Sequence, residues 1–561
     1  MYGAGMENVI VPYILSFFSD LWYDVPVNEK NGVQDRTMRQ KKLIILFFYM
    51  ALLAACAGIV WLLGRLNSPV EPGKPSVQES EYPEQTETSV EETLTGETEG
   101  EQPTETGSEE GLEVSGRPAG TNKPGGQTEV LDETPPPYEP PRLMLVSDLH
   151  YMSASTHDDG KAFWNMVKSD DGKAHQYSEQ LLDALAARAL EEKPSALVLS
   201  GDITLNGEME NHLELAKKLK EIQDGGVPVV VIPGNHDIQN HNAAVYFGEK
   251  KEEAEYLTSG DDFYEIYHSF GYDQSPNRDP ASLSYVYPVD PWHWLLMLDT
   301  CQYEDGNHVN GRLKPETLKW LEVHLQVAQE HGIQVLPIGH HNLLWESRLY
   351  TDDCTMENYQ EITALFEKYQ VPLYISGHLH VQRVKKHQPE PGEQKQYGIS
   401  EIVLGAVSLS PNHYGMLSWD DLGGMHFETN QLNLEGWIPE VENYGEWSED
   451  FFKEIIRTQT EKKISLVPDD LKKLMAELYT DVYYDYCAGN RIEKETVIRR
   501  RAYALWMRAE PENPCVNQIM QMIKDGGSEA KAWHWEPEYP IVRENFQEEA
   551  EETAAEEELG K

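Results

Sequence analysis

Basic residues are scarce in this chain of 561 residues: 46 Lys and Arg stand against 96 Asp and Glu, a formal net charge of −50. A surface that binds duplex nucleic acid needs a basic footprint, so this balance argues against such a partner. Cysteine is also scarce, with five residues and no C-x-x-C pair, which argues against a cysteine zinc site. Cys487 and Cys515 could form a disulfide, although free buried thiols are favoured.

A long apolar run without any charged residue occupies positions 43–64. As a helix it would span about 33 Å, enough to cross the hydrocarbon core of a bilayer. Basic residues precede it at Arg36, Arg39, Lys41 and Lys42, so the positive-inside rule puts residues 1–42 in the cytoplasm. We therefore expect a single-pass protein of the cell membrane whose catalytic part is extracellular. The alternative is a lipoprotein cleaved and anchored at Cys56.

Large apolar side chains are almost missing from residues 65–141, which are rich in Glu, Thr, Pro and Gly. Positions 66–140 hold 18 acidic and 3 basic residues. Such a segment cannot bury enough surface to offset the entropy lost on folding, so it predicts a disordered acidic linker. The acidic residues of 546–561 predict a similar tail.

Apolar runs alternate with helical periodicity from residue 142 to about 442, which predicts an α/β domain. The first six predicted strands are 143–146, 196–199, 227–232, 294–298, 334–338 and 373–375. Three later runs, 381–385, 399–404 and 415–419, suggest a second sheet. Residues 446–545 show helical periodicity alone, and this predicts a separate all-α C-terminal domain.

Five of the predicted strands end in polar residues of the same kinds. The endings are Asp148 and His150, Gly201 and Asp202, Asn235 with His236 and Asp237, His340 and His341, and His378 and His380. If the strands belong to one sheet, these endings converge at its carboxyl edge. A mixed set of oxygen and nitrogen ligands suits two divalent ions such as Mn, Fe or Zn better than Ca or Mg.

This ordered set of motifs resembles the calcineurin-like metallophosphoesterase superfamily. The flanking residues Gly201-Asp-Ile-Thr-Leu-Asn-Gly-Glu208 and Pro233-Gly-Asn-His-Asp237 are most similar to the class III cyclic-nucleotide phosphodiesterase branch, and there to exported bacterial members with a C-terminal helical domain. The resemblance implies a four-layer α/β/β/α sandwich with a binuclear metal site. It covers about residues 142–420.

The resemblance also implies roles for individual residues. One metal would be held by Asp148, His150 and His380, the other by Asn235, His340 and His378, with Asp202 as the bridge. His236 would be the acid that serves the leaving group, oriented by Asp237. The motif register favours His340 over His341 as the ligand, which leaves His341 behind the metal site. Asn342 departs from the Pro that the family often has after its paired histidines.

The function implied is hydrolysis of phosphoric esters, with diesters favoured, by attack of a hydroxide that bridges two metal ions. Partners would then be a phosphate-ester substrate and the membrane, while the sequence leaves the oligomeric state open. A phosphomonoesterase or nucleotidase is an alternative within the same chemistry. A surface binding protein that uses this fold as a scaffold is an alternative of another class. The presence of all seven expected ligands favours the enzyme.

Overall fold

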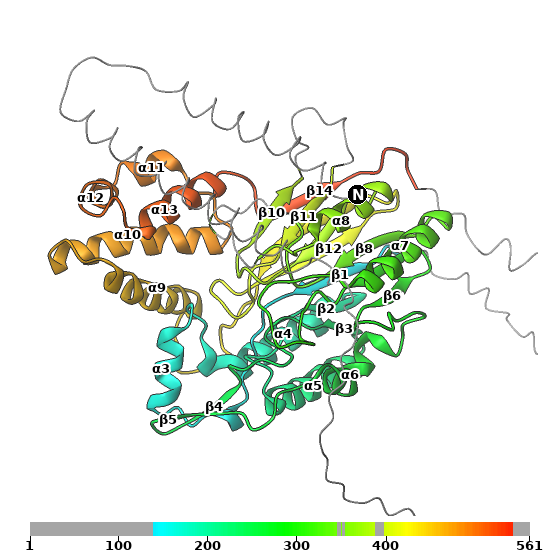
Figure 1. Cartoon of the computed structure of the whole chain (residues 1–561), viewed down its shortest axis with the longest axis horizontal. Helices are drawn as coiled ribbons and strands as arrows, with labels where there is room; N and C mark the ends of the chain where they lie inside the picture. Colours follow the sequence, from blue (N-terminus) through cyan, green and yellow to red (C-terminus); the bar gives the residue numbers. More distant parts are fainter. Residues whose placement is uncertain (1–137, 345–348, 350–353, 388–397, 542–561) are drawn as a thin grey trace, which may run out of the picture. The chain divides into compact units, whose positions relative to one another are not determined.

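The computed structural model describes residues 138–344, 349, 354–387 and 398–541 (Figure 1). The predicted anchor (43–64), the acidic linker up to residue 137 and the tail (546–561) lie outside the described residues. No helix within the described ranges is both long and apolar enough to cross a bilayer.

The first of two six-stranded sheets has the strand order β14-β13-β12-β1-β2-β3. Its strands are β1 (Arg142–Val146), β2 (Ala196–Ser200), β3 (Val229–Ile232), β12 (His413–Trp419), β13 (Met425–Gln431) and β14 (Ala532–Trp535). Strands β1, β2 and β3 are parallel, and β12, β13 and β14 continue the sheet in antiparallel pairs. Every residue of β2 and β3 is buried, as expected for parallel strands with both faces covered.

The second sheet has the order β10-β11-β9-β8-β7-β6. Its strands are β6 (Tyr285–Asp290), β7 (His293–Met297), β8 (Gln334–Ile338), β9 (Leu373–Ser376), β10 (Arg383–Lys386) and β11 (Ser400–Val403). The four strands β7, β8, β9 and β11 are parallel, and β6 and β10 close the two edges in antiparallel pairs.

The two sheets share one hydrophobic core. On β7, Leu295 and Met297 belong to the same buried cluster as Leu145 and Leu199 of the first sheet. The intervening Leu296 belongs instead to the cluster formed with α7 (Pro315–Glu330) and α8 (Tyr359–Lys368). Because strand side chains alternate between faces, the second sheet lies between the first sheet and these helices.

Helices α4 (Ser178–Glu192) and α5 (Met209–Asp224) pack apolar side chains against the strands of the first sheet, among them Leu182, Leu185, Leu215 and Leu219. The layer order is therefore the α/β/β/α sandwich that the resemblance implies. Helix α7 begins with Pro315 at its first turn, where a missing backbone N–H costs nothing.

Shorter elements occupy the connections. They are η1 (Ala154–Thr156), α3 (Lys161–Ser169), η2 (His175–Tyr177), β4 (Ala244–Phe247), β5 (Lys250–Glu253), α6 (Gly260–Tyr267) and η3 (His268–Tyr272). The stretch between the first motif and α4 thus contains η1, α3 and η2. Ser178 is the first residue of α4, and its hydroxyl accepts a hydrogen bond from the Met152 backbone N–H.

The C-terminal helical region consists of α9 (Tyr444–Lys463), α10 (Asp469–Cys487), α11 (Lys494–Ile498), α12 (Arg501–Ala509) and α13 (Pro514–Asp525). Its core includes the fully buried Trp506, whose indole N–H donates to the Met475 carbonyl at 2.8 Å. The expectation of an all-α domain is wrong in one respect: after α13 the chain returns as β14 and pairs with β13. Cys487 and Cys515 are buried free thiols, as favoured from the sequence.

Two expectations about the sheets are wrong. The five polar strand endings do not come from one sheet, because β1, β2 and β3 belong to the first sheet and β8 and β9 to the second. The later strands do not form a sheet of their own either: β10 and β11 extend the second sheet and β12 extends the first. The periodicity of a short strand does not indicate which of two sheets the strand joins.

Candidate metal centre

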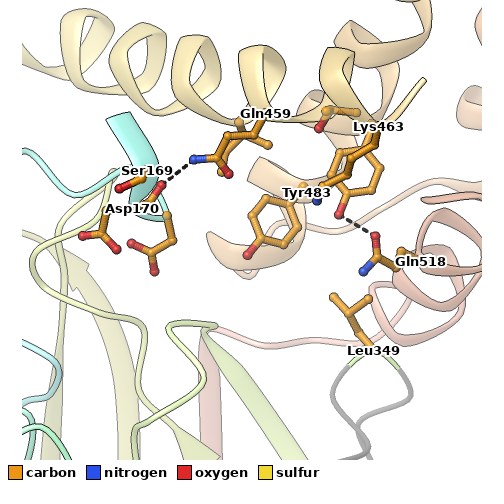
Figure 2. Close-up of a pocket in the computed structure, with 11 residues that line it drawn as sticks. Ser169, Asp170, Leu349, Gln459, Lys463, Tyr483 and Gln518 are labelled. Carbon is orange, nitrogen blue, oxygen red and sulfur yellow. Dashed lines mark hydrogen bonds between the residues drawn. The ribbon is translucent and has the colours of Figure 1, made fainter. Parts of the chain in front are cut away.

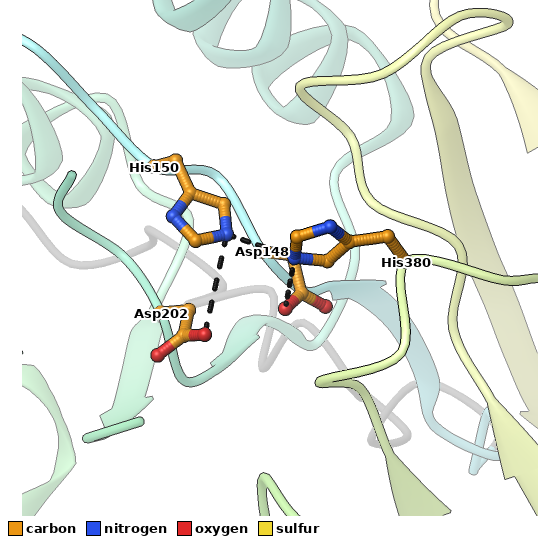
Figure 3. Close-up of side chains that lie close together, drawn as sticks. All are labelled: Asp148, His150, Asp202 and His380. Atoms are coloured by element: carbon orange, nitrogen blue, oxygen red, sulfur yellow. Dashed lines mark hydrogen bonds and ion pairs between the residues drawn. The ribbon is translucent and has the colours of Figure 1, made fainter. Parts of the chain in front are cut away.

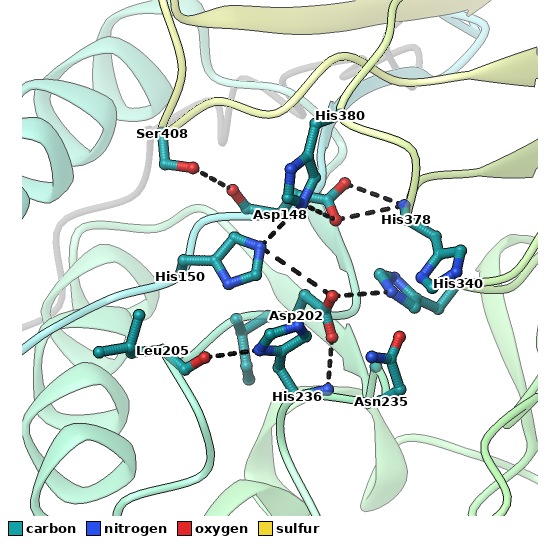
Figure 4. Close-up of polar contacts among 12 residues, drawn as sticks. Asp148, His150, Asp202, Leu205, Asn235, His236, His340, His378, His380 and Ser408 are labelled. Carbon is teal, nitrogen blue, oxygen red and sulfur yellow. Dashed lines mark hydrogen bonds and ion pairs between the residues drawn. The ribbon is translucent and has the colours of Figure 1, made fainter. Parts of the chain in front are cut away.

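The polar endings of β1, β2, β3, β8 and β9 meet at one end of the two facing sheets (Figure 4). Nine of the ten predicted site residues lie there, on the turns that follow these strands: Asp148, His150, Asp202, Asn235, His236, His340, His341, His378 and His380. Asp237 follows on the same turn as Asn235. The convergence expected within one sheet is therefore achieved between two sheets.

One group of possible ligands comprises Asp148, His150, Asp202 and His380 (Figure 3). Their ligand atoms all lie within 4.8 Å of one another. His150 Nε2 lies 3.0 Å from His380 Nε2 and 4.0 Å from Asp202 Oδ2. His380 Nε2 lies 3.3 Å from Asp148 Oδ1.

A second group comprises Asp202, His340 and His378. His340 donates from Nδ1 to the Ser200 carbonyl at 2.9 Å, so its Nε2 faces Asp202 Oδ2 at 3.0 Å. Asp202 belongs to both groups, which is the arrangement that a bridging carboxylate requires. Figure 4 shows Asn235 beside Asp202, with its amide oxygen on the side of His340.

The donor set fits divalent cations. Two imidazole nitrogens, of His150 and His380, face each other beside two carboxylates. Among the described residues, the Asn235 Oδ1 atom is buried and has no hydrogen-bond donor within the protein. Buried polar atoms are almost always paired, so an oxygen left free at this place is consistent with a metal ligand. Mixed imidazole and carboxylate ligands suit Mn, Fe or Zn.

Backbone strain is concentrated at these residues. Positive φ angles occur at Asp148 (54°), His150 (46°), Asp202 (48°), His378 (70°) and His380 (55°). This left-handed conformation is unfavourable for residues with a side chain, at about 1–3 kcal/mol each. The surrounding fold enforces it where the ligand side chains must be turned toward one another.

Close packing of the two sheets explains Gly377. A Cβ atom at this position would lie 1.8 Å from Ser147 Oγ and 2.6 Å from Asp148 Oδ2. The backbone N–H of His378 can therefore donate to the Asp148 carboxylate at 3.1 Å. Glycine at position 377 thus lets the β9 turn reach the β1 turn.

Burial and neighbouring charges keep some of the proposed ligands deprotonated, which is the form that binds metal, and keep others protonated. Burial opposes ionisation of Asp202, but His340 and His236 outweigh it and hold the pKa of Asp202 well below its usual value. Burial, assisted by Lys173, holds the pKa of His150 well below its usual value, so this ring is neutral. Burial opposes protonation of His340 as well, but Asp202 raises its pKa to about 9. A cation must therefore displace a proton from His340.

His236 is half-buried, and its ring lies 4.8 Å from the His150 ring. Its Nδ1 donates to the Leu205 carbonyl at 2.7 Å and lies 3.0 Å from Asn206 Oδ1. This arrangement leaves Nε2 for a substrate. The backbone N–H of His236 donates to Asp202 Oδ1 at 2.7 Å, which connects the acid to the bridging carboxylate.

Asp237 does not orient the His236 ring, so this part of the implied mechanism is wrong. The Asp237 carboxylate is fully buried and accepts hydrogen bonds from Gly234 N (2.8 Å), Ile203 N (3.2 Å), Thr204 N (2.9 Å) and Thr204 Oγ1 (2.8 Å). It therefore holds the turn after β2 against the turn after β3. The ring of His236 is oriented instead by the carbonyl of Leu205.

His341 is buried and uses both ring nitrogens within the protein. Its Nδ1 lies 2.7 Å from Thr300 Oγ1 and its Nε2 lies 2.9 Å from the Val309 carbonyl. A ring engaged in this way does not offer a ligand atom, which supports the choice of His340. Asn342, the departure from the family pattern, donates from its amide to Ser376 Oγ and to the Gly377 carbonyl, and so connects the β8 and β9 turns.

Sequence reasoning missed residues that hold the predicted ligands in place. Asp171 accepts from His380 Nδ1 at 2.5 Å, and Ser408 donates to the Asp148 carbonyl at 2.7 Å. Neither follows an apolar strand in the manner of the other site residues. Nothing in the sequence pattern could have distinguished Asp171 from its acidic neighbours.

Comparison with known proteins agrees with this geometry. Residues 141–382 match the family described as calcineurin-like phosphoesterase. This region is a calcineurin-like metallophosphoesterase domain. It thus belongs to a family of metal-dependent phosphoesterase hydrolases and has the His/Asp cluster typical of binuclear members. Residues 439–528 match the C-terminal domain of cyclic nucleotide phosphodiesterase, which corresponds to the helical region of this metallophosphoesterase.

Three curated proteins are similar to this metallophosphoesterase at low identity. An uncharacterized metallophosphoesterase-like protein of Bacillus subtilis (strain 168) is 24% identical over 43% of this chain and 48% of its own length. A probable cyclic nucleotide phosphodiesterase of Xenorhabdus bovienii (strain SS-2004) is 24% identical over 34% of this chain and 63% of its own. The glycerophosphodiester phosphodiesterase GpdQ of Enterobacter lignolyticus (strain SCF1) is 26% identical over 42% and 70%, respectively. The alignments with the first two span less than two thirds of those relatives.

Proposed function

We propose that this protein is a binuclear metal-dependent phosphodiesterase. The observation that carries the proposal is the position of Asp202, whose carboxylate belongs to both groups of possible ligands. In this proposal Asp148, His150 and His380 hold one ion, and Asn235, His340 and His378 hold the other. When bound, two divalent ions supply an activated water and neutralise charge that develops on the phosphoryl group.

The residues of the chain set the geometry for this chemistry. Both Asp202 and Asp148 are fully buried, so their side chains are held in a fixed place rather than moving in solvent. Burial opposes their ionisation, but neighbouring histidines lower the pKa of each and keep both as carboxylates. His150 is kept neutral by burial, which is the form that binds a cation. The hydrogen bond that His340 donates from its outer nitrogen, Nδ1, to the Ser200 carbonyl fixes the orientation of the ring, and this leaves one defined nitrogen facing the centre.

His236 is proposed as the acid that protonates the leaving oxygen. Because its Nδ1–H donates to the Leu205 carbonyl, the protonated ring presents its second N–H at Nε2. This ring lies beside His150 at the same end of the two sheets, where the phosphate ester would bind. General acid catalysis of this kind typically contributes about 10²–10⁴-fold.

Diesters are favoured over monoesters for two reasons. The helical region matches the C-terminal domain of cyclic nucleotide phosphodiesterase, and two of the relatives carry phosphodiesterase names.

Leaving-group dependence provides the test. We expect His236→Ala in the Mn-loaded protein to keep its metal and to lose about 10²–10⁴-fold on an alkyl phosphodiester, but distinctly less on a nitrophenyl phosphodiester. His331→Ala is the matched control, since His331 is exposed at the end of α7. Equal losses on both substrates would contradict the role of His236 as acid. Absence of hydrolysis by the unmodified Mn-loaded protein across phosphodiesters and phosphomonoesters would contradict the proposed activity itself.

The location outside the cell is proposed from the sequence alone. Segment 43–64 would tether the protein to the membrane as an uncleaved helix, with the catalytic domain on the outer side. Mass spectrometry of the mature protein is then expected to find residues that precede Cys56. A mature protein that starts with lipid-modified Cys56 would replace the helix with a lipid anchor.

A further inference from the structure

The turn that carries His378 and His380 is packed into the core of the helical region. Leu379 and Val381, the neighbours of His380 in the chain, belong to the same buried cluster as Phe452 of α9 and Met475 of α10. The two cluster members alternate with the proposed ligands along the turn. Apolar contacts with the helical region therefore fix the backbone from which His380 projects.

Hydrogen bonds hold the end of the same turn. The backbone N–H of Gln382 donates to the Cys487 carbonyl at 2.9 Å, and its side-chain amide donates to the Ala530 carbonyl at 3.0 Å. Cys487 is the last residue of α10, and Ala530 precedes β14. The helical region thus contacts the turn through both apolar and polar groups.

The ring of His380 is held from its outer side by Asp171. His380 donates from Nδ1 to Asp171 Oδ2 at 2.5 Å, on the side opposite the nitrogen that faces Asp148. Lys173 donates to the other oxygen, Asp171 Oδ1, at 2.6 Å. Lys173 is buried, with 4% of its surface exposed, whereas 29% of the Asp171 side chain is exposed, so only the Lys173 end of the ion pair is removed from solvent.

The loop that carries Asp171, residues 169–173, is in turn held by α9. Gln459 donates from its side-chain amide to the Asp170 carbonyl at 2.7 Å (Figure 2). Gly172 has φ +107°, and a Cβ atom there would lie 2.7 Å from the ring of Phe452. The loop therefore lies directly on α9, at a place where only glycine fits.

A cavity of about 450 Å³ lies next to this contact, between the 169–173 loop and α9, α10 and α13. Its lining includes Asp170, Asp171 and Gln459 (Figure 2). Asp171 and Gln459 therefore border a solvent-sized space and are not locked inside a continuous core. Side-chain changes at these two positions can be absorbed without creating a void in the core.

We propose that the helical region is a structural part of the metal centre: α9 holds the 169–173 loop so that Asp171 fixes the His380 ring for metal binding. Asp171 and Gln459 are positioning residues, since neither reaches the metal position itself. The inference rests on the proposed function, because it takes His380 as a metal ligand. The helical region would thus support metal binding at one of the two metal positions.

The physical basis is the carboxylate–histidine–metal arrangement. An acceptor at the outer ring nitrogen fixes the tautomer and the ring orientation and makes the inner nitrogen a stronger donor, and loss of such a partner typically weakens metal binding about 10–100-fold. Asp148, His150 and His380 form one position, so the effect should fall on one ion of two. The position that contains His340 and His378 should be unaffected.

The test is equilibrium dialysis of the full chain against Mn²⁺, combined with electron paramagnetic resonance of the loaded protein. We expect Asp171→Ala to weaken the binding of one of the two Mn²⁺ ions about 10–100-fold. Asp171→Asn keeps a neutral acceptor and should weaken the binding of this ion less. At a Mn²⁺ concentration that fills one position, the variant should show the spectrum of an isolated Mn²⁺ ion in place of a coupled pair. Asp273→Asn is the matched control, because Asp273 pairs with His268 at 2.7 Å on the exposed surface.

The contribution of α9 is tested by a double-mutant cycle. Gln459→Ala should weaken the binding of the same Mn²⁺ ion. In the Asp171→Ala background it should cause no further loss of affinity, because α9 acts through Asp171. Gln326→Ala, at an exposed position of α7, is the control for the loss of a helix glutamine. Additive losses would show that α9 acts by another route and would overturn the inference.

Two further outcomes separate this inference from the proposed function. If Asp202→Asn abolishes metal binding while Asp171→Ala and Gln459→Ala bind both ions normally, the metal centre stands and the inference is wrong. If Asp202→Asn leaves two ions bound, the proposed centre itself is wrong. Circular dichroism of the metal-free variants checks their folding; Asp171→Asn, which is isosteric, gives the decisive result if Asp171→Ala does not fold.

Discussion

Asp237→Asn distinguishes the observed role of Asp237 from the one implied by family resemblance. Each carboxylate oxygen accepts two hydrogen bonds: Oδ1 from the backbone and hydroxyl of Thr204, and Oδ2 from the backbones of Ile203 and Gly234. Asparagine has one oxygen, so its amide nitrogen must face one of these pairs. The cheaper orientation turns the nitrogen toward Thr204, whose hydroxyl can rotate to accept.

The cost of this orientation can be estimated. The Thr204 backbone N–H loses its acceptor while it stays buried, which costs about 1–3 kcal/mol. The opposite orientation would leave two backbone donors without a partner, at about twice that cost. Burial and the charge of Asp202 raise the pKa of Asp237 to about 6, so loss of the charge itself is tolerated. We therefore expect about 1–3 kcal/mol less stability.

Urea unfolding of the metal-free protein, followed by tryptophan fluorescence, measures this loss. Because Asp237 holds the β2 turn against the β3 turn, hydrolysis of alkyl and nitrophenyl phosphodiesters should fall by the same factor. His236→Ala should instead affect the alkyl ester more. Unchanged stability together with a selective loss on the alkyl ester would refute this reasoning and restore Asp237 as the partner of the His236 ring.

Two predictions concern protons. Burial opposes protonation of His340 and His380, but Asp202 beside the first and Asp171 beside the second raise both pKa values to about 9. Metal loading at pH 7 should therefore release about two protons per chain, and the affinity for metal should rise toward pH 9. Calorimetry in buffers of different ionisation enthalpy measures the number of protons released. Metal binding without proton release would contradict these charge states. Burial lowers the pKa of His212 to about 4, although the Asp237 carbonyl at 2.9 Å partly offsets it. The unfolded chain, with a pKa near 6.5, then binds a proton that the folded chain does not, so up to about 3 kcal/mol of stability should be lost as the pH falls from 6.5 to 4. His212→Gln should remove this part of the acid sensitivity in urea titrations at each pH, and an unchanged pH profile would show that His212 is not its source.

The residues of the site could be predicted from the sequence more accurately than the arrangement of the strands in sheets. Asp148, Asp202 and His340 could be found because each follows a short buried strand, and buried parallel strands have a strong apolar signal. That signal carries no information on which sheet a strand joins. The prediction that two sheets pack face to face therefore rests only on the family resemblance.

Long-range contacts explain the remaining differences. Asp171 contacts a residue more than 200 positions away in the sequence, and β14 pairs with β13 after five helices. The orienting role of Asp237 comes from the family resemblance, whereas the structure gives its carboxylate other partners. On this turn, adjacent side chains point to different sides: Asp237 toward the β2 turn and His236 toward the Leu205 carbonyl.

The central claim, a binuclear centre bridged by Asp202, is tested most directly by counting metal ions in the purified protein and in Asp202→Asn. The unmodified protein, dialysed against Mn²⁺, should hold two ions per chain and hydrolyse a phosphodiester. Asp202→Asn removes the charge shared by both ligand groups, so it should lose most of the bound metal and nearly all hydrolysis. Two ions and near-normal turnover in Asp202→Asn would contradict the binuclear centre.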